Sequence, residues 1–265
     1  MTPAFPIPSP KSRRDFKGEA LAPVLSYGHS MRRRDLLTAL TAAGFVPAAD
    51  HPEAGSLYIP KAHLVEDRTF LHDFMDEYSF VDLITSQPTL RITHIPCFLQ
   101  RTSGQFGSIF GHISRNNVQS QAFDGKQSAV IVFRGPHSYI SPSWYSKSEA
   151  VPTWNFGVVH ATGKLKPVAE KPDLHKLLAR LIKKFENRYG GSSYDFEKLP
   201  ENYVNGMLGG IIGFEMEIEL LEGKFKLGQE RGDADKAGIL SHLGEHKEAS
   251  MKDFTAAFYA RVPKA

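Results

Sequence analysis

The chain has 265 residues, of which 41% are hydrophobic and 23% charged, so it can form one large or two small packed domains. Its net charge of +3, from 32 basic and 29 acidic residues, is too small to indicate nucleic-acid binding by itself. The single cysteine, Cys97, excludes an internal disulfide and a multi-cysteine metal site. Cys97 lies in an apolar run, which favours a buried and unreactive thiol. No apolar run approaches the roughly 18 residues that a membrane span requires.

The first 56 residues differ in composition from the rest. Residues 1–27 carry proline, serine and charge without periodicity, so we expect disorder there. The segment Arg32–Ala49 joins an arginine cluster to small apolar residues, as in a twin-arginine export signal. Some thirty residues precede it, which suits export only if Met31 is the start, and the alternative is a short amphipathic helix or disordered basic extension. We predict an N-terminal extension over 1–56, one domain over 57–265 and a cytoplasmic location, with export as the alternative.

The first half of the domain alternates one helix with short strands. Phe70, Leu71, Phe74 and Met75 recur at helical spacing and predict a helix. This helix covers 67–78. Turn-forming and β-branched residues then predict strands over 80–85 and 90–99 joined by a turn at 86–89, a strand over 108–113 and a helical turn over 118–123.

The second half ends in helices. A strand over 129–133 breaks at Gly135-Pro136, and a further strand covers 153–162. Leucines at helical spacing predict a helix over 173–185, and alternating apolar residues and glutamates predict a half-buried strand over 213–221. Shorter helices are predicted over 199–208, 233–243 and 251–260. The pattern indicates an α+β protein with an antiparallel β-barrel and flanking helices.

The stretch from Ala129 to His160 contains both tryptophans. Its central loop is rich in rings and hydroxyl groups, namely Tyr139, Ser141, Ser143, Trp144 and Tyr145. Flat rings and short hydrogen-bond donors beside a rigid strand pair are typical of a pocket for a planar polar ligand. The alternative is a packed corner of a sheet, in which the rings only fill space.

Several long segments together resemble one known family. The runs GPHSYISPSWYSK and VPTWNFGVVHATG are similar to the signature of the PaiB family of FMN-binding negative transcriptional regulators. Further segments agree in order: SLYIPKAHL, THIPCFL, GHISRNN, MLGGIIGFEMEI and LEGKFKLGQ. The resemblance covers roughly residues 57–243. It implies an FMN-binding split β-barrel, like that of pyridoxamine-phosphate oxidase, and a homodimer with flavin at the dimer interface.

FMN requires cations and amides for its phosphate, donors for its ribityl chain and a flat wall for its ring. Arg115, beside His112 and Asn116, is the candidate for the phosphate, the alternative being an exposed strand-end turn. The cofactor-binding residues that we predict are His112, Arg115, Asn116, Tyr139, Ser141, Ser143, Trp144, Lys224, Lys226 and Gln229. The alternative for Lys224 and Lys226 is a pair of surface lysines flanking a buried Phe225. The tract from Lys226 to Glu230 departs from the family pattern, and the charge of Glu230 would weaken phosphate binding there.

The histidines of the barrel region predict no metal site. His94, His112, His137 and His160 are isolated in sequence and lack metal-ligand spacing. A lone histidine in a sheet is usually a hydrogen-bonded structural residue, although one could neighbour a flavin, or bind haem if the pocket holds haem instead. No nucleophile motif or phosphate-binding glycine loop is present, so we assign no catalytic residue.

Two functions follow from the resemblance and from the fold that it implies. The first is an FMN-binding homodimer that represses transcription. DNA is the least supported partner, because the sequence shows no helix-turn-helix and no basic recognition helix. The second is a flavin-dependent or haem-binding oxidoreductase that acts on a small substrate, since fold alone does not decide chemistry.

Overall fold

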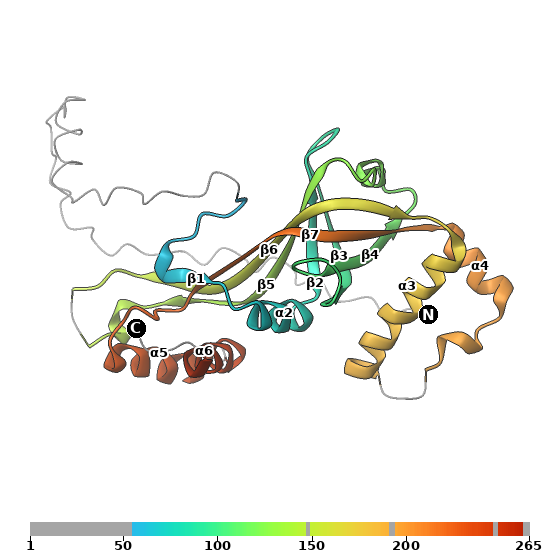
Figure 1. Cartoon of the computed structure of the whole chain (residues 1–265). Coiled ribbons are helices and arrows are strands. Elements are labelled where there is room, and N and C mark those ends of the chain that lie inside the picture. The colour runs from blue at the N-terminus through green and yellow to red at the C-terminus, as the bar shows by residue number, and fades with distance from the viewer. Residues whose placement is uncertain (1–54, 147–148, 191–193, 246–248, 262–265) are drawn as a thin grey trace, which may run out of the picture. The chain divides into compact units, whose positions relative to one another are not determined.

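The computed structural model describes residues 55–265, except 147–148, 191–193, 246–248 and 262–265 (Figure 1). The disorder and the export signal expected before residue 55 lie outside this part of the chain. Within the described part, no helix is both long and apolar enough to cross a membrane.

The described elements follow the order expected for a barrel with flanking helices. They are β1 (Leu64–Val65), α2 (Arg68–Glu77), β2 (Phe80–Thr85), β3 (Arg91–Gln100), β4 (Ser108–Ser114), β5 (Ser128–Ile140), β6 (Thr153–Val168), α3 (Lys171–Phe185), α4 (Glu201–Gly209), β7 (Ile211–Lys226), α5 (Asp233–Glu245) and α6 (Ala249–Arg261). Short helical turns lie at η2 (Val118–Ala122), η3 (Pro142–Trp144) and η4 (Glu186–Gly190).

Six of the strands close into an antiparallel barrel. The sheet order is β1-β7-β4-β3-β2-β5-β6, and β7 pairs with β6 as well as with β4, which closes the ring. The short β1 pairs with the far end of β7, where Leu64 lies opposite Lys224. This architecture confirms the predicted antiparallel barrel with flanking helices.

Alternation along the strands places the core inside the barrel. In β2, Val81, Leu83 and Thr85 are buried, whereas Phe80 and Ile84 face outward. Asp67 caps the N-terminus of helix α2, and its carboxylate accepts hydrogen bonds from the backbone N–H groups of Thr69 and Phe70. This helix buries an aromatic and aliphatic face against the barrel, so its predicted position is confirmed.

The remaining helices lie at opposite ends of the long strands β6 and β7, as Figure 1 shows. Helices α3 and α4 pack on the outside near the start of β7, with Leu174, Leu177 and Leu181 buried. Helices α5 and α6 pack at the other end, where Phe258 joins Phe225 in the main core. The helical predictions for both regions are confirmed.

One predicted break is wrong. Strand β5 does not stop at Gly135-Pro136 but continues to Ile140, with a register shift against β6 between Arg134 and His137. An irregularity of this kind accommodates a proline, which has no N–H for the ladder. Gly135 is needed for a second reason, because a Cβ there would lie 2.8 Å from the ring of Phe74.

Candidate functional site

The predicted phosphate residues lie together where β4 ends. His112 belongs to β4, and Arg115 and Asn116 follow it on the exposed surface. The guanidinium of Arg115 donates to the carbonyl oxygens of Gly209, at 3.2 Å, and Ile211, at 2.9 Å. These bonds join the end of β4 to the end of α4. We call His112, Arg115 and Asn116 the β4-end group.

A second cation lies near the β4-end group, on β3. Asn117 donates to the hydroxyl of Thr93 at 2.9 Å, and the buried Gln119 donates to the carbonyl of Arg91 at 3.3 Å. The turn that follows Asn116 is therefore fastened to β3. The Nε of Arg91 is buried and has no hydrogen-bond partner in the described structure. A buried donor without a partner is costly, and an oxygen of a bound ligand would satisfy it.

Sequence reasoning missed Arg91, although it is the basic residue that opens the strand containing the THIPCFL segment. Its side chain is partly buried, and it pairs across the sheet with the buried Thr85, whose hydroxyl also lacks a partner. An arginine at the mouth of a predicted barrel strand could have been noticed as a candidate.

The predicted ring-binding residues lie where β5 ends. Tyr139 is exposed and meets the ring of Trp154 edge to face, with centroids 6.1 Å apart. Ser141 caps the N-terminus of η3 and Ser143 lies within it, and their hydroxyl oxygens are 2.8 Å apart. Trp144 packs partly buried against the main core. We call Tyr139, Ser141, Ser143 and Trp144 the β5-end group.

The lysines of β7 lie near the β5-end group and are engaged within the chain. Lys226 donates to the hydroxyl of Thr153 at 2.5 Å, and Thr153 pairs with Ile140. Lys224 donates to the carbonyl of Tyr58 at 2.8 Å. Burial lowers the pKa of Lys224, and the nearby charge of Lys226 lowers it further. An anion placed between them would relieve that repulsion.

Gln229 completes this region through backbone contacts. Its amide donates to the carbonyls of Ala62 and Phe225, and its oxygen accepts the N–H of Leu227. Glu230 turns toward His63, with 3.9 Å between the carboxylate and the ring. In this geometry Gln229 holds the turn after β7.

The two groups lie far apart within one chain. His112 pairs with Gly213 near the start of β7, whereas Lys224 lies near its end. At about 3.3 Å per residue, this separation is about 35 Å along the strand. A single FMN in one chain therefore cannot touch the β4-end group and the β5-end group together.

The four histidines singled out in the sequence occupy separate positions. Burial lowers the pKa of His112, and burial also lowers the pKa of His160, whose Nδ1 lies 3.0 Å from the hydroxyl of Ser56. His94 Nδ1 lies 2.5 Å from the carboxylate of Asp82. Among the described residues, no three histidine, cysteine or acidic side chains gather in a way that could hold a metal ion.

Comparisons with known proteins agree on one family. The family model described as "Putative FMN-binding domain" matches residues 57–220. The chain is 30% identical over 209 residues to "Protease synthase and sporulation protein PAI 2" of Bacillus subtilis, covering 78% of this chain and 99% of that protein. It is also 29% identical to an uncharacterised protein of Emericella nidulans, over 58% of this chain and 75% of that one.

Solved structures are similar only at low identity. The flavocytochrome Anf3 of Azotobacter vinelandii is 13% identical, with a TM-score of 0.48 over 66% of this chain and 74% of its own. The FAD and haem binding protein of Mycobacterium smegmatis is 12% identical, with a TM-score of 0.47 over 66% of this chain and 79% of its own.

The family model covers both groups of candidate residues and the barrel as far as Leu220, and with the Bacillus relative it confirms the resemblance drawn from the sequence segments. The chain belongs to the PaiB family of FMN-binding proteins, and FMN is the cofactor that this membership gives it.

Proposed function

We propose that the phosphate of FMN binds at the β4-end group, between Arg115 and Arg91. The observation that carries this is the buried Nε of Arg91, which lacks an acceptor. Two N–H groups of Arg115 donate to the carbonyls of Gly209 and Ile211. Because a guanidinium has five N–H donors, the others can bind an anion. His112 and Asn116 complete the site. When bound, FMN supplies one- and two-electron redox chemistry.

We further propose that the protein is a homodimer in which a second copy completes the cofactor site. The β5-end group, with Lys224, Lys226 and Gln229, lies too far from the β4-end group to share its ligand within one chain. A second copy could bring its own β5-end group to this ligand, against the ring or the ribityl chain. The outer face of β2, β3 and β5 supports such pairing, because Leu90 and Ile92 are exposed beside Ile84 and Val130.

We propose negative regulation of transcription as the role, with flavin as the sensory ligand. Helix α3 is the most basic of the described helices, but two of its cations are engaged within the chain. Arg180 lies over the ring of Phe98, and Lys184 pairs with Asp76. Direct DNA contact through this helix therefore gains no support, and a regulator that acts through its flavin state is the better reading.

A flavin-dependent oxidoreductase is the second candidate, and the pair formed by Asp82 and His94 favours it. The Asp82 carboxylate is 13% exposed and holds both His94 and Arg134, whereas the His94 side chain is 61% exposed. A carboxylate at Nδ1 orients an imidazole so that Nε2 can accept or donate a proton outside. Such an imidazole on the outer face could serve a small substrate.

The test begins with the absorption spectrum of the freshly purified protein and the mass of whatever is released on denaturation. FMN in stoichiometric amount supports the proposal, and purified protein that neither contains nor takes up FMN contradicts it. Bleaching by a nicotinamide donor favours the oxidoreductase. A salt-sensitive shift of promoter DNA, absent with random DNA, favours the regulator. Ile92→Glu, compared with Tyr203→Glu on α4, tests whether loss of the dimer also releases FMN.

A further inference from the structure

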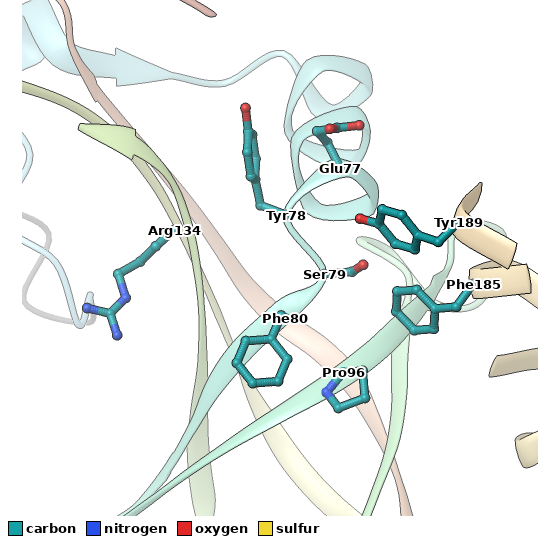
Figure 2. Close-up of a pocket in the computed structure, with 8 residues that line it drawn as sticks. All are labelled: Glu77, Tyr78, Ser79, Phe80, Pro96, Arg134, Phe185 and Tyr189. Carbon is teal, nitrogen blue, oxygen red and sulfur yellow. The ribbon is translucent and has the colours of Figure 1, made fainter. Parts of the chain in front are cut away.

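A groove of about 580 Å³ lies outside both groups of candidate flavin residues. It lies between the end of α2, the start of β2 and the end of α3 (Figure 2). Its lining residues are Glu77, Tyr78, Ser79, Phe80, Pro96, Arg134, Phe185 and Tyr189. The volume falls within the range of about 300–1,000 Å³ that is typical of small-molecule sites.

One wall of the groove is an aromatic pair that is held in place. The rings of Phe185 and Tyr189 stack with centroids 6.2 Å apart and an interplanar angle of 12°. Tyr189 is 71% exposed, yet the guanidinium of Arg188 lies 5.0 Å from its ring centroid. Arg188 is itself fixed by the carboxylate of Glu77 and the carbonyl of Asp76. The wall is thus exposed to solvent but supported from within the chain.

The opposite side of the groove is the ring of Phe80. This residue opens β2, its backbone pairs with Pro96, and it is 69% exposed. Figure 2 shows Phe80 on one side of the groove, Phe185 and Tyr189 on the other, and Pro96 below. Large exposed rings that face a common space are typical of a binding site for a flat apolar molecule.

The charges around the groove are already matched. Glu77 pairs with Arg188, and Arg134, whose guanidinium points away from the rings in Figure 2, pairs with Asp82. A charged ligand would have to compete with these pairs. The Tyr189 hydroxyl offers a hydrogen bond without a charge. The groove is therefore complementary to an uncharged ligand.

We propose that this groove binds an uncharged, planar aromatic molecule with hydrogen-bonding groups on its edge. The ring packs between Phe80 on one side and Phe185 on the other, and its edge meets the Tyr189 hydroxyl. No residue assigned to the FMN site lines the groove, so the two sites are separate. Phe80 and Pro96 share the outer face of β2 and β3 with Ile84 and Ile92, so the proposed pairing of two copies must leave the groove open.

Equilibrium dialysis of the FMN-loaded full chain against quinolin-2-one tests the proposal. We expect one saturable site per chain, at least tenfold weaker binding for Phe80→Ala and for Tyr189→Ala, and at least tenfold weaker binding of quinoline-2-carboxylate. Tyr203→Ala, which removes an exposed ring from α4, should change binding less than twofold. Circular dichroism identifies any variant that fails to fold. If either Phe80→Ala or Tyr189→Ala fails to fold, the binding measured for the other variant tests the proposal.

Absence of saturable binding to the wild-type chain overturns the proposal, and so does equal binding by the wall variants. Light scattering separates the remaining alternative, in which a second copy covers the groove. Conversion of a dimer to monomers by Phe80→Ala or Tyr189→Ala assigns the groove to an interface and overturns the ligand site. Flavin content is measured on the same samples, so failure of FMN loading is distinguished from failure of this proposal.

Discussion

The indole of Trp144 lies flat against the imidazole of His242, with ring centroids 5.3 Å apart and an interplanar angle of 8°. This stack joins η3, at the end of β5, to helix α5. The helix approaches so closely that a Cβ on Gly238 would overlap the carbonyl oxygen of Trp144. Trp144 therefore packs within the chain, whether or not it also contacts flavin.

Trp144→Ala should lower the free energy of unfolding by roughly 2–4 kcal/mol, because it removes a large, partly buried ring and its stacking on His242. Urea denaturation measures this change. Trp154→Ala is the matched control, since Trp154 is 52% exposed, and we expect an effect below about 1 kcal/mol. Equal losses in the two variants would contradict a packing role. FMN retention in Trp144→Ala tests its proposed contact with the cofactor separately.

Arg115→Ala should weaken FMN binding about 10- to 100-fold, because it removes the charge-assisted contact to the phosphate that we propose. Fluorescence titration of the flavin-free protein gives the dissociation constant. Arg68→Ala is the control, since Arg68 also donates to a backbone carbonyl, that of Gln105. Unchanged affinity in Arg115→Ala would remove Arg115 from the proposed site, and a comparable loss in Arg68→Ala would show that the effect is not local.

Two substitutions of glycine by alanine should change the stability of the protein in opposite directions. A Cβ on Gly163 would overlap the carbonyl oxygen of Glu217, at the register shift between β6 and β7. Gly163→Ala should therefore destabilise the barrel by about 3 kcal/mol. Gly206 lies within α4 with nothing within 4 Å of its would-be Cβ, so Gly206→Ala should stabilise by about 0.5–1 kcal/mol. Thermal unfolding measures both, and a neutral Gly163→Ala would show that β6 and β7 can separate there.

Cys97 should resist thiol reagents in the native protein. It is buried in the barrel, and burial raises the pKa of its thiol to about 12. Because the thiolate is the reactive form, labelling should require unfolding. The labelling rate with a disulfide reagent, followed across a urea series, should track the unfolded fraction. Rapid labelling in the absence of urea would mean that the strands around Cys97 open locally.

Stability should fall as the pH drops below neutrality. Burial lowers the pKa of His63, His72, His112 and His160 in the folded chain, so these rings stay neutral where the unfolded chain takes up protons. Their contribution is complete above the unfolded pKa of about 6.5 and is lost as the pH falls toward the folded values. Each of these histidines lowers the free energy of unfolding by at most about 1.4 kcal/mol per pH unit. Urea denaturation at pH 7.5, 6.5 and 5.5 measures the slope.

His112→Gln should reduce that slope, because it removes one of the buried rings. His137→Gln, which removes an exposed ring, is the control for the exchange of histidine for glutamine. A slope equal to that of the wild type in His112→Gln would place the pH dependence in other groups.

Local patterns predicted most of the fold. The alternation in β2 and the leucine spacing in α3 are each set by one burial face, so a single sequence reveals them. The extent of β7 was underestimated. The prediction ended at Leu221, where the alternation of apolar and acidic residues stops, but β7 continues to Lys226 because β6 and β1 supply partners on both edges. Those partners come from distant segments, and no local pattern records them.

The candidate site was harder to predict than the fold. The motifs named Arg115 and Trp144 but gave no distance between them, and closure of the barrel places their groups at opposite ends of β7. The place of Arg91 at the start of a predicted strand could have made it a candidate, but the buried donor without a partner that singles it out is visible only in the three-dimensional structure. Sequence segments thus identified the cofactor better than they identified the arrangement of residues around it.

The bonds from Arg115 to Gly209 and Ile211 have a mechanical consequence. A phosphate that draws this guanidinium toward itself must lengthen or redirect the tether on the last turn of α4. Binding of FMN and the position of α4 are then thermodynamically coupled, so that each changes with the other. Protease cleavage near α4 should therefore differ between empty and loaded protein, which would let other molecules detect the flavin without touching it.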